Sequence, residues 1–146
     1  MDIKTKDIYD LDLTKHKDKI TAVSRVYLKA PNEIEELPVH EQSKLFAPIM
    51  LENSMLAKYE GVHGGWKVND IHIRFAVTKD MYEIDSTPAK EQALRLVHLT
   101  TNMSVENILE MPFSVFKTMF IILTNYINGD ASCMHSRECK CERKTY

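Results

Sequence analysis

The feature that most constrains the fold of this chain is a run of helical patterns over residues 87–129, above all its last segment, residues 113–127. Pro112 stands just before this segment, where a helix start tolerates proline, and Asn128-Gly129 just after it is a typical helix end. Apolar residues cover nearly every side of a helix over 113–127, and such a helix is buried on most sides. The segment is therefore predicted to be the core helix of a small domain, or a helix that keeps one face for a partner.

Two further helices are predicted ahead of this segment. Thr87 fits an N-cap, and Pro88 fits the first position of a helix that ends near Leu99. Ser104 offers the N-cap of a short helix over 105–110. Protein contact surfaces are enriched in methionine and aromatic residues. This half of the chain supplies four such candidates for a contact face: Met103, Met111, Met119 and Phe120.

A membrane span does not fit this pattern. A spanning helix needs about 20 mostly apolar residues. The longest unbroken apolar run here covers only residues 119–123, and Lys117 lies within the same helix. The N-terminus is charged and lacks the apolar block of a secretory signal. We therefore expect no membrane partner and place the protein in a cytoplasm.

The N-terminal part is predicted to form a β-hairpin. Apolar and polar residues alternate over 9–13 and again over 20–29, and this period of two is typical of half-buried strands. The polar residues between the two runs suit an antiparallel hairpin with a loop of about five residues. Asn32 is then expected to cap a short helical turn over 33–36.

The middle of the chain combines a long helix with further strands. Apolar residues recur at helical spacing over 38–59, and Pro48 is expected to kink or split this helix. Residues 66–77 have strand character, either as two strands around a turn at 69–70 or as one continuous strand. Residues 79–86 are predicted to be a polar connection. The fold class is therefore α+β, with a small antiparallel sheet of about three or four strands packed by helices.

Length and composition are those of one small globular domain. The chain has 146 residues, of which 44% are hydrophobic and 27% charged. We predict a single α+β domain over 1–129, followed by a Cys/His-rich tail over 130–146. The net charge of −2 argues against a nucleic-acid protein that binds by bulk attraction.

The tail carries the most specific chemistry in the sequence. Three cysteines and a histidine fall close together in it: Cys133, His135, Cys139 and Cys141. Thiolates and an imidazole suit a tetrahedral zinc site, which would be structural because four protein ligands close the shell. The alternative is a tail whose cysteines have no such role. A site shared between chains, or completed by His63 or His72, also fits the residues.

No pattern of residues points to an enzyme. The chain has no glycine-rich phosphate loop, no nucleophile elbow and no H-E-x-x-H motif. The most unusual loop is His63-Gly64-Gly65-Trp66, where we expect Trp66 to be a hydrophobic anchor under a strand. A ligand site at this loop is the alternative, in which His63 or His72 would act as a base near Asp70.

One segment resembles a known family. Residues 93–113, continuing to 127, contain a helix, the element T-x-x-S-x-E-x-I from Thr101 to Ile108, and a final apolar helix. This arrangement is similar to the C-terminal part of tail assembly chaperones of tailed bacteriophages, and related proteins assist assembly of the baseplate hub. The expected hairpin over 9–29 and the long helix after it match the front half in outline. The resemblance implies a structural or assembly protein that binds other tail proteins without catalysis.

Two functional hypotheses follow. The first is a non-enzymatic interaction protein of phage tail or baseplate assembly, found in the host cytoplasm or in the virion, whose partners are other protein subunits or further copies of itself. Its tail would bind zinc or dock on a partner. The second is a small zinc-binding nucleic-acid-binding or regulatory protein. Its phosphate contacts would come from four basic residues of the tail: Arg137, Lys140, Arg143 and Lys144.

Overall fold

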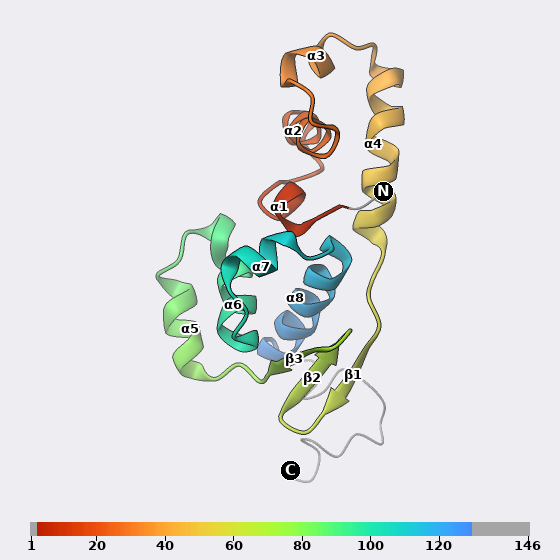
Figure 1. Cartoon of the computed structure of the whole chain (residues 1–146). Coiled ribbons are helices and arrows are strands. Elements are labelled where there is room, and N and C mark those ends of the chain that lie inside the picture. The colour runs from red at the N-terminus through yellow and green to blue at the C-terminus, as the bar shows by residue number, and fades with distance from the viewer. Residues whose placement is uncertain (1–2, 130–146) are drawn as a thin grey trace.

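The computed structural model describes residues 3–129, and its architecture is α+β, as predicted (Figure 1). An antiparallel sheet in the order β1-β2-β3 lies at one end of a mainly helical structure. Its strands are β1 (Tyr59–Val62), β2 (Gly65–Val68) and β3 (Ile71–Arg74). The helices are α1 (Thr5–Ile8), α2 (His16–Tyr27), α3 (Pro31–Glu35), α4 (Val39–Ser54), α5 (Thr78–Asp85), the 3-10 turn η1 (Ala89–Glu91), α6 (Gln92–Thr101), α7 (Val105–Glu110) and α8 (Phe113–Ile127).

Two clusters of buried apolar side chains organise these elements. One cluster includes Ile49 of α4 and joins the helices of the N-terminal half, which form the upper part of Figure 1. The other includes Trp66 of β2 and joins the sheet to α6, α7 and α8 in the lower part. Phe113, at the start of α8, packs against both clusters. The division of the chain into one domain over 1–129 and a tail stays a prediction.

The bounds of the C-terminal helices agree closely with those predicted from the sequence. Both α7 and α8 have the predicted bounds, and the Ser104 hydroxyl accepts a hydrogen bond from the Asn107 amide at 3.1 Å, as an N-cap should. The helix predicted from Pro88 begins instead as η1 and continues as α6. The reason is local, because the Thr87 hydroxyl donates to the Glu83 carbonyl at 2.7 Å and caps no helix. The core-helix interpretation of α8 is confirmed by the burial of its inner face.

The predicted N-terminal hairpin is wrong, since α1 and α2 replace it. Ala22 and Val23 are neighbours in the sequence and both are fully buried, whereas a strand would place them on opposite faces. In α2 they share one face with Val26, and the alternation over 20–29 follows from that helical spacing. Leu28 then takes a left-handed conformation with φ 56°, which ends the helix and leaves its side chain 91% exposed.

Side-chain hydrogen bonds fold the other alternating run into a turn. The Asp12 carboxylate accepts from the Thr14 amide at 3.1 Å and from the Thr14 hydroxyl at 2.6 Å. Asp18 accepts from the Asp12 amide at 2.8 Å. Such local bonds compete with the pairing of strands. The same pattern over 9–13 therefore forms a turn that leads into α2.

The middle of the chain confirms some predictions and corrects others. The two-strand alternative is confirmed, because Asn69-Asp70 forms the turn between β2 and β3, with Asn69 at φ 47°. The long helix passes through Pro48 but ends at Ser54, and Tyr59, the predicted end of the helix, instead begins β1. Residues 79–86 do not form a connection but belong mostly to α5, whose start is capped by the Asp80 carboxylate.

The start of the chain joins the two clusters. The Thr5 amide donates to the Met111 carbonyl at 2.9 Å, and the Phe113 amide donates to the Ile3 carbonyl at 2.8 Å. Lys4 and Lys6 both contact the Glu110 carboxylate, with Nζ–Oε distances of 2.7 and 2.6 Å. These hydrogen bonds, from Lys4 first and Lys6 second, lower the pKa of Glu110 to about 2.

The lysine pair should be visible in the titration of this carboxyl. In a carbon-detected NMR titration at low salt, Glu110 is expected to titrate near pH 2, and Lys4→Met is expected to raise its pKa toward the ordinary value of about 4.3. Lys6→Met should have a smaller effect in the same direction, because its hydrogen bond is the weaker cause. A Glu110 pKa in the ordinary range in the unmodified protein would contradict the observed geometry.

The pairing of β2 with β3 depends on Gly65. A Cβ atom at this position would lie 1.8 Å from the Ile73 carbonyl oxygen, which is a backbone atom that cannot turn away. Gly65→Ala is therefore expected to lower the free energy of unfolding by about 2–3 kcal/mol, measured by urea denaturation. Gly64→Ala is the matched control, since Gly64 has φ 84° but nothing within 4 Å of its Cβ position. Equal losses for the two variants would mean that strain, not the close approach of the strands, sets the cost.

Candidate functional site

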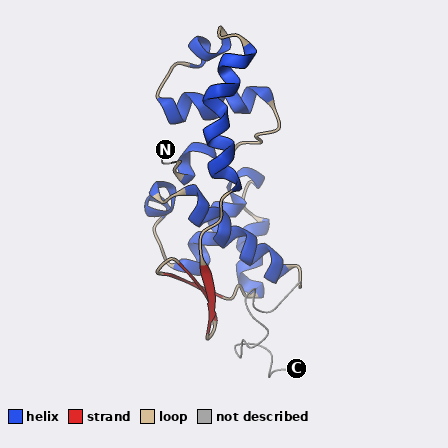
Figure 2. Ribbon diagram, turned by 90° about the vertical axis from the view of Figure 1, so that its right-hand side faces the viewer, coloured by secondary structure: helices blue, strands red, loops and turns tan. Residues whose placement is uncertain are grey.

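The helix α4 has two apolar faces, and only one of them is covered. Its inner face carries Phe46 and Ile49, which are buried in the N-terminal cluster. The outer face is open to solvent, although Val39, Met50 and Leu51 lie on it with exposed fractions of 77, 40 and 65%. In Figure 2 the right-hand side of Figure 1 faces the viewer, and α4 lies in front. We call this surface the outer α4 face, and it consists of Val39, Ser43, Ala47, Met50, Leu51 and Ser54, continued by Met55 at the helix end.

The spacing on the outer α4 face is that of a helix-packing surface. Residues 47, 50, 51, 54 and 55 follow the i, i+3, i+4, i+7, i+8 pattern that lines one side of a helix. Between Lys44 and Lys58 the only charged residue is Glu52. Apolar side chains scattered singly on a surface need no explanation, but a contiguous group often marks a contact site.

Hydrogen bonds hold the lower end of α4 in place from behind. The Lys117 ammonium of α8 donates to the Asn53 carbonyl, and the Ala57 amide donates to the Thr118 hydroxyl at 2.8 Å. These bonds lie on the side of α4 that faces α8. The outer α4 face is therefore presented by a helix that is anchored at its end, and a partner would meet an ordered surface.

This surface is not evident from the sequence. The apolar residues of 38–59 recur at helical spacing, but that spacing does not say which of them are exposed, and the structure divides them between two sides of α4. The predicted candidates for a contact face are partly wrong, since Met111 and Met119 are buried in the core. The available clue was the number of apolar positions around α4, which exceeds what a single buried stripe requires.

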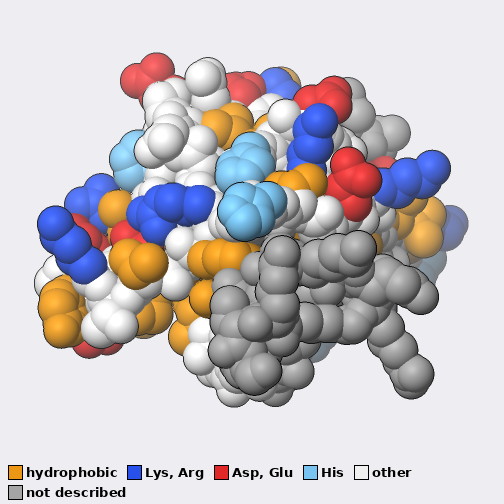
Figure 3. Space-filling model, turned by 90° about the horizontal axis from the view of Figure 1, so that it is seen from below, with side chains coloured by type: hydrophobic (Ala, Val, Ile, Leu, Met, Phe, Trp, Pro, Cys, Tyr) orange, Lys and Arg blue, Asp and Glu red, His pale blue; other side chains and the backbone are white. Residues whose placement is uncertain are grey.

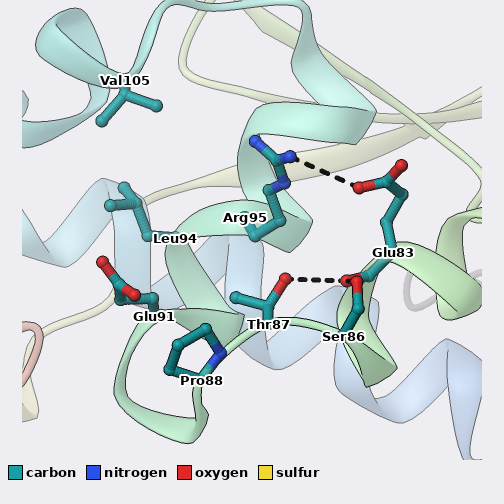
Figure 4. Close-up of a pocket in the computed structure, with 8 residues that line it drawn as sticks. All are labelled: Glu83, Ser86, Thr87, Pro88, Glu91, Leu94, Arg95 and Val105. Carbon is teal, nitrogen blue, oxygen red and sulfur yellow. Dashed lines mark hydrogen bonds and ion pairs between the residues drawn. The ribbon is translucent and has the colours of Figure 1, made fainter.

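A pocket of about 340 Å³ opens between the end of α5, η1, α6 and the start of α7 (Figure 4). Leu94 and Val105 supply its apolar lining. Arg95 and Glu83 form an ion pair at its rim with an Nη2–Oε2 distance of 3.3 Å, and both side chains are largely exposed. Glu91 adds a second carboxylate to the lining.

The chemistry of this pocket suits binding and not nucleophilic attack. The hydroxyls of Ser86 and Thr87 both donate to the Glu83 backbone carbonyl, at 2.9 and 2.7 Å. Among the described residues that line the pocket there is no histidine or cysteine to act as base or nucleophile. The pocket can hold a small polar group or a partner's side chain against Leu94.

The loop around Trp66 is structural. Trp66 is fully buried and packs edge-on against Phe75 and Tyr126, so the prediction of a hydrophobic anchor is confirmed. His63 lies in the β1–β2 turn and Asp70 in the β2–β3 turn, at opposite ends of β2. His72 is exposed on β3. Figure 3 shows histidine beside basic side chains on the side of the molecule seen from below.

The predicted zinc ligands Cys133, His135, Cys139 and Cys141 lie outside the described residues. Within residues 3–129 no three histidine, cysteine, aspartate or glutamate side chains are grouped as metal ligands. The zinc site therefore stays a prediction. Elemental analysis of the purified, untagged protein is expected to find about one zinc per chain, lost in Cys139→Ser while the circular dichroism of the helices is kept.

Comparison of the chain with protein-family models, with curated proteins and with solved structures found no match. In the part of the chain that the structure describes, no helix has both the length and the apolar character needed to cross a membrane.

Proposed function

We propose that this protein is a non-enzymatic interaction protein that binds another protein subunit through the outer α4 face. The observation that carries this proposal is the exposure of Val39, Met50 and Leu51 on one side of a regular helix. Removal of apolar surface from water is favourable by about 25 cal/mol per Å². A partner that covers this side of α4 would gain that contribution, and it would meet the exposed side chains of His40 and Lys44 at the N-terminal end of the helix.

The setting that we propose is assembly of a phage tail or baseplate. Its support is the resemblance of residues 93–127 to tail assembly chaperones. The front part of that resemblance depended on a β-hairpin, which α1 and α2 replace. The C-terminal segment and the long helix α4 remain in support of it.

Site-specific crosslinking tests the interaction. A photoreactive amino acid at position 51 is expected to give adducts with a protein partner in the cells that naturally make this protein, and mass spectrometry identifies that partner. Position 82 is the matched control, because Tyr82 is 68% exposed but lies on α5, away from α4. Equal adducts at both positions, or none at position 51, would refute the proposed surface. A tail or baseplate subunit in the adduct would support the proposed setting, and an unrelated protein would refute it.

A further inference from the structure

We infer that Met50 and Met55 form an oxidation site, and that conversion of their thioethers to sulfoxides prevents a partner from binding the outer α4 face. This inference rests on the proposed function, since it names a regulation of the same surface. The face has four large apolar side chains, and two of them are these methionines. Methionine suits a contact surface because its side chain is flexible and polarisable. Oxidation converts that apolar side chain into a polar one.

Exposure separates Met50 and Met55 from the other methionines that the structure describes. The two residues are 40 and 49% exposed. Every other methionine within residues 3–129 lies in the cluster that includes Trp66 or packs against it: Met81, Met103, Met111 and Met119. An oxidant dissolved in water must reach the sulfur, so exposed methionines react first. A peroxide is therefore expected to modify the outer α4 face before the core.

The reaction requires a peroxide as its only co-reactant. The sulfur lone pair attacks one oxygen of hydrogen peroxide, and the O–O bond breaks as the S–O bond forms. The hydroxide that leaves takes the proton of the new S–O–H group and becomes water. The sulfur is oxidised and the peroxide is reduced. Methionine sulfoxide reductases reverse this change, so the surface can be restored.

A sulfoxide on this face would oppose the burial that favours binding. Its oxygen accepts hydrogen bonds, and burial of such a group against an apolar partner without a donor is costly. The Ser54 hydroxyl, one turn after Met50, already donates to the Leu51 carbonyl at 2.7 Å. That hydroxyl is therefore not free to donate to a sulfoxide at Met50.

Oxidation at these positions is expected to leave α4 folded. The buried residues of the helix, Phe46 and Ile49, belong to the N-terminal cluster and contain no sulfur. The hydrogen bonds from Lys117 and to Thr118 hold the lower end of α4 on its other side. The circular dichroism of the helices should therefore be kept, and a loss of binding would come from the changed surface.

Mass spectrometry of the full chain after timed exposure to hydrogen peroxide tests the site. Met50 and Met55 are expected to form sulfoxides at least about tenfold faster than Met111 and Met119, which react only when the structure opens locally. Equal rates for the exposed and the buried pair would overturn the inference.

Hydrophobic-interaction chromatography tests the change of the surface without a partner. Peroxide is expected to shorten the retention of the unmodified protein, because apolar surface becomes polar. Met50→Leu combined with Met55→Leu is the matched control, and its retention should change less. This double variant keeps every other methionine and all three cysteines, so peroxide effects elsewhere occur in both proteins. Equal changes in retention would overturn the inference.

Crosslinking from position 51 tests the effect on binding and separates this inference from the proposed function. The purified protein with the photoreactive residue is treated with peroxide and added to an extract of the cells that naturally make it. The yield of adducts is expected to fall at least about tenfold, and the double variant should keep its adducts. Adducts that persist after both methionines are oxidised overturn the inference and keep the proposed function. No adduct before treatment overturns both.

Discussion

Replacing Trp66 by alanine is expected to lower the free energy of unfolding by about 3–5 kcal/mol, the largest effect of any single change considered for this protein. The side chain is fully buried at the centre of the sheet. Its ring lies 5.0 Å from that of Phe75 and 5.4 Å from that of Tyr126, edge-on to both, and those two rings stack at 5.0 Å. Alanine would leave a cavity bordered by both rings.

The loss should come from packing and not from a hydrogen bond. The Trp66 indole Nε1 is buried and has no hydrogen-bond partner among the described residues. Trp66→Phe is therefore the matched control, since it removes an unsatisfied donor and keeps most of the apolar volume. We expect it to cost about 1–2 kcal/mol.

Urea denaturation followed by circular dichroism is the suitable measurement. Trp66 is the only tryptophan of the chain, so its fluorescence is lost in both variants. If Trp66→Ala and Trp66→Phe lower the free energy of unfolding equally, the loss comes from a hydrogen bond of the indole nitrogen and not from packing. A loss below about 1 kcal/mol for Trp66→Ala would show that this cluster does not hold the sheet.

Asp80→Ala is expected to cost about 3 kcal/mol, because it removes a buried carboxylate that accepts charge-assisted hydrogen bonds from Arg74, whose own side chain is 39% exposed, and that caps a helix. Arg74 contacts Asp80 through two hydrogen bonds of 2.8 and 2.9 Å, and the aspartate side chain is only 9% exposed. The same carboxylate accepts from the Val77 amide at 2.8 Å and so caps α5. Arg74 also donates to the Leu99 carbonyl at 2.9 Å. One change therefore loosens the contacts among β3, α5 and α6.

The pH dependence of stability gives a second measurement of this pair. The hydrogen bonds from Arg74, and then the one from Val77, hold the pKa of Asp80 below its ordinary value. In the unfolded chain that value is about 3.9. The ionised pair therefore contributes stability above about pH 4, and this contribution is lost as the pH falls through the lowered pKa of the folded state.

The difference between the unmodified protein and Asp80→Ala should accordingly shrink in acid. Urea titrations at pH 7 and at pH 3 would measure it. Asp80→Asn is the control, since asparagine keeps the shape and the capping oxygen but not the charge, and an intermediate loss is expected. A difference that stays constant between the two pH values would mean that the charge of Asp80 contributes nothing.

Local signals in the sequence were sufficient for the C-terminal half. Ser104 and Pro112 set the starts of α7 and α8, and Gly129 follows the end of α8. These residues act within one turn of their own position, through a capping hydrogen bond or a fixed φ angle. The turn at Asn69-Asp70 was one of two alternatives that the local signals left open, and the structure decides for it.

The N-terminal half could not be predicted in this way. The apolar residues over 20–29 fit a period of two, but they also fit one face of a helix, and short runs satisfy both periods. Burial of the adjacent pair Ala22 and Val23 against α4 decided between them. The Arg74–Asp80 ion pair could not be predicted from the sequence either. Arg74 also donates to the carbonyl of Leu99, which lies far along the chain.

The proposed contact surface depends on tertiary structure most of all. The sequence established that α4 is helical and rich in apolar residues, because helical spacing is a property of the chain alone. It did not establish which apolar side is covered. That depends on the helices that pack against α4, and they meet Phe46 and Ile49 while leaving Leu51 in solvent. Periodicity defines the faces of a helix, and only the arrangement of its neighbours decides which face remains open to a partner.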